Sequence, residues 1–350
     1  MLFQESSLVV QTSQLGDVVL TTPLIARLAQ RGPVDVITTR RCAGLLRQNP
    51  DVRSLIVFDK NGSHKGLLGL LRFAAHLRHR QGRRGRYAAA YLAQGSVRSA
   101  ALAALAGVRE RVGFDTSAGA SLCRRSVRYA ADEHHALRLW RLGGPGEPEL
   151  GKIAPRLFPS AGDVRRAGEL LRECPPGLPI YALAPGSRRG TKRWPHFANL
   201  ARLLGEKAAV VVLGGPEDRQ EGETIRAARG HNVTVNLAGA ASLLTAAAAL
   251  RHAAVLVCND SAAQHMAAAT GTPVVAVFGP TLPSWGFGPL SPHAVVLEPG
   301  PLACRPCAKE APHTCPQGHW RCMTETTQEI VMGTVQDLIS RSLVRVDSGR

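Results

Sequence analysis

The sequence predicts an α/β protein of two doubly wound domains, and three observations lead to this fold class. Short apolar runs alternate with helical patterns, which is typical of parallel sheets covered by helices. The alternation stops at turn-rich breaks near the middle of the chain and then restarts. The chain has 350 residues, 45% hydrophobic and 20% charged, which is enough for two globular domains of ordinary size.

The first half of the chain holds four predicted strands. Each is a mostly apolar run that ends in a polar residue. Helical patterns lie between them, most clearly in residues 18–30 and 67–80. The arginine-rich stretch 82–86 is interpreted as a solvated basic loop. The predicted strands are residues 7–11, 34–39, 54–59 and 87–94.

Two turn-rich stretches, residues 143–151 and 174–179, separate the halves. A helix is predicted between them, over residues 161–173. The strand and helix alternation then restarts and ends with a helix over residues 327–343. The predicted strands of this half are residues 180–184, 208–213, 233–237, 253–258 and 274–278.

Residues 254–281 form the clearest βαβ unit. Residues 253–258 are apolar and predict a buried parallel strand. The polar segment 259–261 can cap the following helix, and residues 271–273 can end it. His265 lies one turn into this helix. Because ligands bind at the carboxyl ends of the strands in such sheets, and helix N-termini favour anions, we expect a phosphate group here.

These patterns define the expected domains. Residues 1–173 form an N-terminal Rossmann-like domain, and residues 174–326 form a second one that includes a cysteine-rich segment, 304–322. Residues 327–350 form a C-terminal helix that could pack back on the first domain. Two such domains facing a cleft are the simplest architecture.

The net charge of +17 is uneven. Residues 1–160 hold 24 Lys and Arg against 11 Asp and Glu, which indicates an anionic partner or surface. A genome that favours arginine would explain part of this excess. A basic nucleic-acid-binding protein is an alternative, but 5% aromatic residues and the lack of a known reader module argue against nucleic acid.

No apolar run is as long as a transmembrane helix. The first residues, MLFQESSLVVQTS, lack a basic n-region and a small-residue cleavage site. We therefore expect no signal peptide and a cytoplasmic protein.

Asp17 follows Gly16 just after the first predicted strand. A carboxylate at this strand end could take a proton from a hydroxyl nucleophile. An acid near a helix start also stabilises the helix dipole, and spacing alone favours that second interpretation.

The loop at residues 184–195 follows another predicted strand. Four cations and the hydroxyls of Ser187 and Thr191 make it a candidate diphosphate site, with an exposed basic loop as the alternative. The cations are Arg188, Arg189, Lys192 and Arg193.

The strand at 208–213 is followed by Gly214, which permits close backbone approach, and by Glu217, which could bind ribose hydroxyls. This is not a GxGxxG fingerprint. The chain also lacks a GxxxxGK[ST] P-loop, which argues against an NTPase.

Four of the eight cysteines lie in CRPCAKEAPHTCPQGHWRC, close to two histidines. The CxxC pair is typical of metal sites, but the second pair is separated by six residues rather than two. A structural metal and a turn-rich cluster of reduced thiols both remain open. The candidate ligands are Cys304, Cys307, Cys315 and Cys322.

Three segments together resemble the ADP-heptose:lipopolysaccharide heptosyltransferase family (glycosyltransferase family 9). They are SLVVQTSQLGDVVLTTPLIARL, APGSRRGTKRWPHFANLARLL and CNDSAAQHMAAATGTPVVAVFGPT, in the family's order and spacing. The resemblance extends from about Leu8 to Cys322, and the cysteine-rich tail is most similar to the heptosyltransferase II branch.

The resemblance implies the GT-B fold and an inverting transfer of heptose from ADP-L-glycero-D-manno-heptose to the lipopolysaccharide inner core. The acceptor, a phosphorylated lipid A–core saccharide, belongs to the N-terminal domain, and the ADP-sugar to the C-terminal domain. It also implies peripheral contact with the cytoplasmic face of the inner membrane. Alternatives are heptosyltransferase I or III, another nucleotide-sugar transferase, and an inactive binding member.

By the same resemblance, Asp17 is the general base and Lys192 holds the diphosphate. Ser187 and Arg188 match donor-phosphate contacts. Ala262 replaces a common glycine, and Arg188 replaces a hydroxyl residue found in some relatives. Without a DxD-type carboxylate pair, we expect no metal cofactor for the chemistry. The family's donor-binding segment corresponds to Asp260, Ser261, Ala262 and His265.

Overall fold

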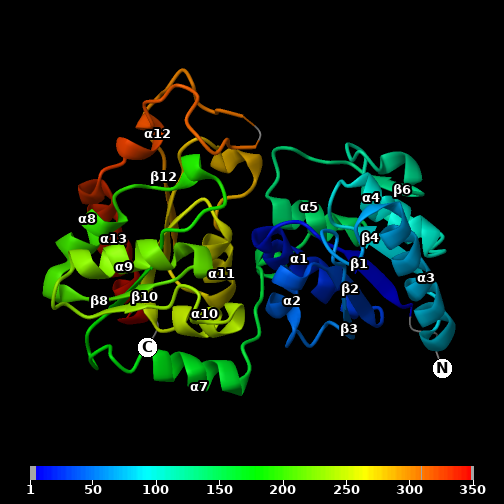
Figure 1. Ribbon diagram of the computed structural model, residues 1–350, viewed down its shortest axis with the longest axis horizontal. Helices are drawn as coiled ribbons and strands as arrows, with labels where there is room; N and C mark the ends of the chain where they lie inside the picture. The colour runs from blue at the N-terminus through cyan, green and yellow to red at the C-terminus, as the bar shows by residue number, and fades with distance from the viewer. Residues whose placement is uncertain (1–4, 309, 348–350) are drawn as a thin grey trace. The chain divides into compact units, whose positions relative to one another are not determined.

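The computed structural model describes residues 5–308 and 310–347 of the chain. It divides into two units, Met1–Phe158 and Pro159–Arg350. Figure 1 shows that each unit contains a sheet with helices packed against it. The predicted α/β class is confirmed.

The first unit is built on a parallel sheet of six strands in the order β3-β2-β1-β4-β5-β6. The strands are β1 (Ser7–Val10), β2 (Val34–Thr38), β3 (Ser54–Val57), β4 (Ala89–Leu92), β5 (Glu110–Phe114) and β6 (Arg125–Val127). The helices are α1 (Leu15–Ala29), α2 (Arg40–Leu46), α3 (Gly66–Arg84), α4 (Val97–Leu105), η1 (Ala120–Leu122), α5 (His135–Leu142) and α6 (Leu150–Ile153).

The second unit repeats this topology, with the strand order β12-β11-β10-β7-β8-β9, again all parallel. The strands are β7 (Ile180–Ala184), β8 (Ala209–Val212), β9 (Thr234–Asn236), β10 (Ala253–Asn259), β11 (Val274–Val277) and β12 (Ala294–Leu297). The helices are α7 (Ala161–Leu170), η2 (Gly190–Lys192), α8 (Phe197–Leu204), η3 (Gly205–Lys207), η4 (Pro216–Asp218), α9 (Arg219–Ala228), α10 (Leu243–Leu250), α11 (Ala262–Thr270), η5 (Pro283–Trp285), α12 (Arg321–Thr324) and α13 (Gln328–Asp347).

Three strands, β5, β6 and β12, were not predicted from the sequence. β5 begins with Glu110 and Arg111, and β6 begins with Arg125, so neither is a clean apolar run. β12 is an edge strand whose residues are only partly buried. β6 is the edge strand of the first sheet, and edge strands tolerate polar residues, which weakens their sequence signal. β12 is apolar but only four residues long.

In each unit the strand order reverses once. The chain steps from β1 to β3 on one side and then returns to β4 beside β1, and it makes the same return from β9 to β10 beside β7. Ligands of open α/β sheets bind at such switch points, outside the carboxyl ends of the strands. The topology therefore marks the ends of β1 and β4 and the ends of β7 and β10.

The division between the units falls earlier than the predicted boundary at residue 173. Helix α7 packs on α10, because Asp163 Oδ1 accepts hydrogen bonds from Ser242 Oγ at 3.2 Å and from Thr245 Oγ1 at 3.0 Å. From the sequence, helix α13 could pack back on the first domain, but Val331 and Val335 are buried in the core of the second unit. Both elements therefore belong to the second unit.

Within the described residues, the structure contains no helix with both the length and the apolar character needed to span a bilayer.

Candidate functional site

Lys192 and Asp260 meet at the switch point of the second unit. Lys192 lies in η2, after β7, and Asp260 directly follows β10. The Lys192 Nζ atom donates to Asp260 Oδ2 at 2.5 Å, and both side chains are mostly buried, 19% and 10% exposed. Asp260 also accepts from Thr281 Oγ1 at 2.6 Å and from Gln264 Nε2 at 3.2 Å. These bonds hold an ammonium group in place at the sheet edge.

Asn259, the last residue of β10, anchors the loop that carries Lys192. Its Nδ2 donates to the carbonyl of Pro185 at 2.7 Å, and its Oδ1 accepts from the backbone N–H of Trp194 at 3.0 Å. Trp194 is fully buried and donates through Nε1 to the carbonyl of Thr326 at 2.6 Å. Both ends of the loop are therefore tied to the core.

Arg193 fastens the same loop to the end of β8. Its guanidinium donates to Asp218 Oδ1 and to Glu221 Oε2, each at 2.8 Å, and its Nε donates to the carbonyl of Ser187 at 3.0 Å. Burial raises the pKa of Glu221, although Arg193 opposes this effect. Arg193 thus has a structural role, whereas Lys192 lies at the switch point, where it pairs with Asp260.

The predicted donor contacts Ser187 and Arg188 lie in the turn after β7. Ser187 is half-buried and Arg188 is exposed, so its charge is accessible to a ligand at the strand ends. A Cβ atom on the preceding Gly186 would lie 2.2 Å from Asp218 Oδ2, so this turn passes against the β8 loop.

Helix α11 begins beside Asp260, with Ser261 as its N-cap residue. The first N–H groups of a helix lack intrahelical partners and favour an anion. Ser261 and Ala262 are half-buried, whereas His265 is 4% exposed and lies within the helix packing. Ser261 and Ala262 thus border the Lys192 site, and His265 lies one turn deeper.

Gly214 and Glu217 lie in the loop after β8, the neighbour of β7. Both are exposed. The Glu217 carboxylate folds over Gly215, because a Cβ atom at that glycine would lie 2.3 Å from Glu217 Oε2. The loop is closed by Asp218, whose Oδ2 accepts from the N–H of Gly215 at 3.0 Å. This geometry leaves an exposed acid near the switch point.

In the first unit, Asp17 lies in the first turn of α1, next to the carboxyl end of β1. Its Oδ2 accepts from the backbone N–H of Gln14 at 3.1 Å. Burial raises the pKa of Asp17, and this backbone hydrogen bond partly offsets the rise. A carboxylate with a raised pKa is a better proton acceptor than an exposed one.

The structure places a side chain beside Asp17 that the sequence analysis did not single out, that of His135. It begins α5, and its Nε2 lies 4.0 Å from Asp17 Oδ1 with 11% of the side chain exposed. Helix α5 packs along α1. The Arg27 guanidinium fixes this pairing, since it stacks 3.4 Å from the Trp140 ring centre and donates to the Trp140 carbonyl at 3.0 Å.

Polar side chains also gather at the switch point of the first unit. Ser13 Oγ donates to Gln94 Oε1 at 2.7 Å, and Gln94 Nε2 donates to Thr12 Oγ1 at 2.6 Å. Lys60 Nζ donates to the carbonyl of Thr12 at 3.0 Å. The loop that precedes Asp17 is therefore held between the ends of β1, β3 and β4.

The four candidate metal ligands do not fit a metal as they lie. Among the described residues, no group of three or more His, Cys, Asp or Glu side chains could hold an ion. Cys304 Sγ lies 3.7 Å from His319 Nε2. Burial and then the nearby thiols, Cys307 first, raise the pKa of Cys322 to about 11. The structural metal therefore remains a hypothesis from the sequence.

The comparisons with known proteins agree with this arrangement. The profile of glycosyltransferase family 9 (heptosyltransferase) matches residues 76–320, well over half of the chain. The chain belongs to glycosyltransferase family 9. This confirms the resemblance found in the sequence and the prediction that the protein is a glycosyltransferase.

This family 9 enzyme is 26% identical to lipooligosaccharide heptosyltransferase 2 of Haemophilus influenzae, over 95% of this chain and 99% of the relative. It is 29% identical to lipopolysaccharide heptosyltransferase 2 of Escherichia coli, over 83% and 87%. The solved structure of E. coli ADP-heptose lps heptosyltransferase II superposes with a TM-score of 0.77 at 25% identity, covering 96% of this chain and 99% of that one. The predicted GT-B fold is confirmed.

Several residues of the site were not singled out from the sequence. Thr281 and Gln264 both bind Asp260. The sequence signal for Thr281 was its position as a polar residue after β11, and the signal for Gln264 was its position four residues after Asp260. Asn259 was considered only as a cap. His135 carries no spacing motif relative to Asp17, because the pairing of α1 with α5 brings them together.

Proposed function

We propose that this chain is an inverting glycosyltransferase that transfers heptose from ADP-L-glycero-D-manno-heptose to the inner core of lipopolysaccharide, as in the heptosyltransferase II branch. The observation that carries the proposal is the Lys192 ammonium held by Asp260 at the switch point beside the α11 N-terminus. A fixed cation and free helix N–H groups are suited to a diphosphate.

On the donor side, Lys192, Arg188 and the first N–H groups of α11 bind the diphosphate. Ser187 adds a hydroxyl donor after β7, and Glu217 in the Gly214 loop accepts from ribose hydroxyls. Charge grows on the diphosphate as the bond to the anomeric carbon breaks, and positioned cations stabilise that charge most in the transition state. Asp260 orients Lys192 for this task and is itself held by Thr281 and Gln264.

On the acceptor side, Asp17 is the general base. An acceptor hydroxyl loses its proton to the Asp17 carboxylate as its oxygen attacks the anomeric carbon, and ADP leaves from the opposite face with the electrons of the broken bond. Inversion follows from this single displacement. His135, 4.0 Å from Asp17, is a positioning residue for the base.

The cations of the donor site supply the positive charge that the leaving diphosphate needs. We therefore expect the transfer rate to be unchanged when a chelator of divalent ions is added, in an assay that also contains the chelator in the control without enzyme. Loss of transfer on chelation, restored by one divalent ion, would contradict this part of the proposal.

The acceptor of such a reaction is a phosphorylated lipid A–core saccharide, and the protein would work in the cytoplasm on the inner face of the membrane. The excess of basic residues in 1–160 supports an anionic acceptor on the first unit.

The direct test is a transfer assay with ADP-heptose and two truncated lipopolysaccharides, one that carries a single heptose and one that carries none. Addition of one heptose to the first acceptor, detected by mass spectrometry, is the expected result. Transfer only to the heptose-free acceptor would indicate the heptosyltransferase I type. Transfer from a different nucleotide sugar, with none from ADP-heptose, would contradict the proposal.

A further inference from the structure

Helix α3 of the first unit exposes an apolar end. Leu67 and Leu68, in its first turn, are each 70% exposed, and Leu71 is 41% exposed. On the opposite side of the same helix, Phe73 and Leu77 are buried in the core of the unit. The helix is therefore anchored by one face, and its other face presents adjacent leucines to the surroundings.

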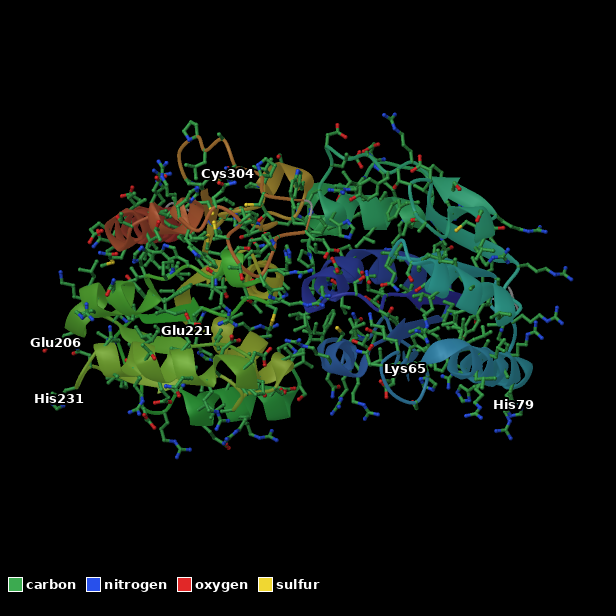
Figure 2. The ribbon with its side chains drawn as sticks, turned by 45° about the horizontal axis from the view of Figure 1, so that its top comes forward. Lys65, His79, Glu206, Glu221, His231 and Cys304 are labelled. Atoms are coloured by element: carbon green, nitrogen blue, oxygen red, sulfur yellow. The ribbon has the colours of Figure 1, made fainter. Side chains whose placement is uncertain are left out.

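The outer face of α3 is also strongly basic. Residues 60–109 contain ten Lys and Arg and no Asp or Glu. Arg72, Arg78 and Arg83 are exposed along the helix beyond the leucines. Figure 2 labels Lys65 just before the helix and His79 near its far end, where the His79 side chain points away from the sheet. Leucines at one end and arginines along the rest make an amphipathic docking face.

The start of α3 is fixed to the body of the unit. Arg98 of α4 donates to the carbonyl of His64 and, at 3.4 Å, to that of Gly66. The His64 ring also packs against Phe58, with ring centres 5.5 Å apart. The exposed leucines are therefore held at a defined position rather than at the end of a free loop.

We propose that this face of α3 is the surface by which the protein docks on an anionic lipid bilayer. Leu67, Leu68 and Leu71 enter the boundary between headgroups and acyl chains, and Arg72, Arg78 and Arg83 contact lipid phosphates. Basic amphipathic helices bind membranes in this way, through buried apolar area and attraction to anionic lipid. The inference rests on the proposed function, because a lipid-linked acceptor requires an enzyme that works at the bilayer.

Other partners fit the face less well. A second copy of the chain would place the same arginines opposite one another across a two-fold interface, and like charges repel. Single-stranded nucleic acid binds through aromatic stacking platforms, and the exposed residues of α3 are leucine, arginine, histidine, alanine and glycine. An anionic bilayer satisfies both the leucines and the arginines.

The test is co-sedimentation of the full chain with vesicles of phosphatidylcholine alone or mixed with phosphatidylglycerol. We expect binding only to the anionic vesicles and loss of binding in high salt. Arg72→Gln with Arg83→Gln should weaken the partition about fivefold for each charge removed. Leu67→Ser with Leu68→Ser should weaken it by roughly tenfold or more. Leu203→Ser, at a 47% exposed leucine of α8 in the second unit, is the matched control and should bind as wild type.

Three results would overturn the inference: equal binding to neutral vesicles, unchanged binding by both double variants, or a change of oligomeric state in the leucine variant measured by light scattering. Titration of every variant with ADP separates this inference from the proposed function. Vesicle binding lost with ADP binding retained supports α3 as the docking surface. A wild-type chain that transfers heptose to a delipidated acceptor but ignores anionic vesicles would contradict docking and leave the transfer proposal standing.

Discussion

Asp17 and Lys192 carry the two halves of the proposed chemistry, and each owes its properties to a few neighbours. Burial raises the pKa of Asp17, as suits a proton acceptor, and its backbone hydrogen bond from Gln14 offsets only part of the rise. Lys192 is held by the Asp260 carboxylate, which two other side chains, Thr281 and Gln264, also bind. The Asp17 carboxylate and the Lys192 ammonium are thus both held in position in the protein without substrate.

Replacing the base tests its role without changing its shape. Asp17→Asn should lower kcat by about 10²–10⁴-fold, because general base catalysis typically contributes that much. The affinity of this variant for ADP should stay at the wild-type value, since the proposed donor-binding residues all belong to the second unit. Steady-state kinetics and calorimetric titration measure the two quantities. Turnover retained at the wild-type level would remove Asp17 from this role.

The raised pKa of Asp17 also predicts a pH dependence. The base must be deprotonated, so kcat/KM should fall as the pH is lowered through a value above 3.8, the ordinary pKa of Asp. Because the folded state binds this proton more tightly than the unfolded state, Asp17 destabilises the fold once the pH rises above its unfolded pKa. Asp17→Asn should therefore raise the free energy of unfolding at pH 7 and change it less in acid. A lower stability at pH 7 would contradict the sign.

At the scale of elements, the pairing of α1 with α5 places His135 beside Asp17. His135→Ala should lower kcat by about tenfold or more with little change in KM, because misplacing a catalytic group mainly affects the chemical step. The acid limb of its pH–rate profile should also move. Thermal unfolding checks that the variant folds. An unaltered kcat and pH profile would mean that His135 is only a packing residue.

The loop that carries Lys192 packs against the cysteine-rich segment, and its closest approach is at Gly190. A Cβ atom at Gly190 would lie 2.3 Å from the backbone oxygen of His313, which cannot rotate away. Gly190→Ala should therefore displace the loop from the cysteine-rich segment, destabilise the protein by about 1–3 kcal/mol and weaken ADP binding.

A matched control is Gly168→Ala in α7, where a Cβ atom meets nothing within 4 Å. That variant should be neutral or more stable by up to about 1 kcal/mol, because alanine favours the helix. Equal stability and equal ADP affinity of Gly190→Ala and the wild type would contradict the close approach.

At the scale of the whole molecule, the two units have the same strand order. Most of their strands could be predicted from the sequence. The strands β1, β2, β7, β8, β10 and β11 are mostly apolar, with Asp35 inside β2 as an exception, and all six were predicted. The boundary was predicted too late, because α7 reads as a connecting helix in the sequence. In the structure α7 packs on α10, and Asp163 accepts hydrogen bonds from Ser242 and Thr245, so the helix belongs to the second unit.

The site was predictable to the extent that its residues directly follow strands. Asp17, Ser187, Lys192, Gly214 and Asp260 all lie after the carboxyl ends of strands in the structure, as the alternating pattern indicated. Their partners were harder to find, because tertiary packing selects them. The hydrogen bonds from Arg193 to Asp218 and Glu221 are an example. The sequence does not show which of the four cations in the loop makes them.

The most direct test of the central claim, that Lys192 at the β7–β10 switch point binds the donor diphosphate, is a titration of the purified chain with ADP, GDP and UDP. We expect selective binding of ADP, weakened roughly 10- to 100-fold in Lys192→Ala, as for the loss of a charged hydrogen bond. Lys207→Ala, at an exposed lysine of the same unit, should bind ADP as wild type does. Selective binding of GDP or UDP, or ADP affinity unchanged in Lys192→Ala, would contradict the claim.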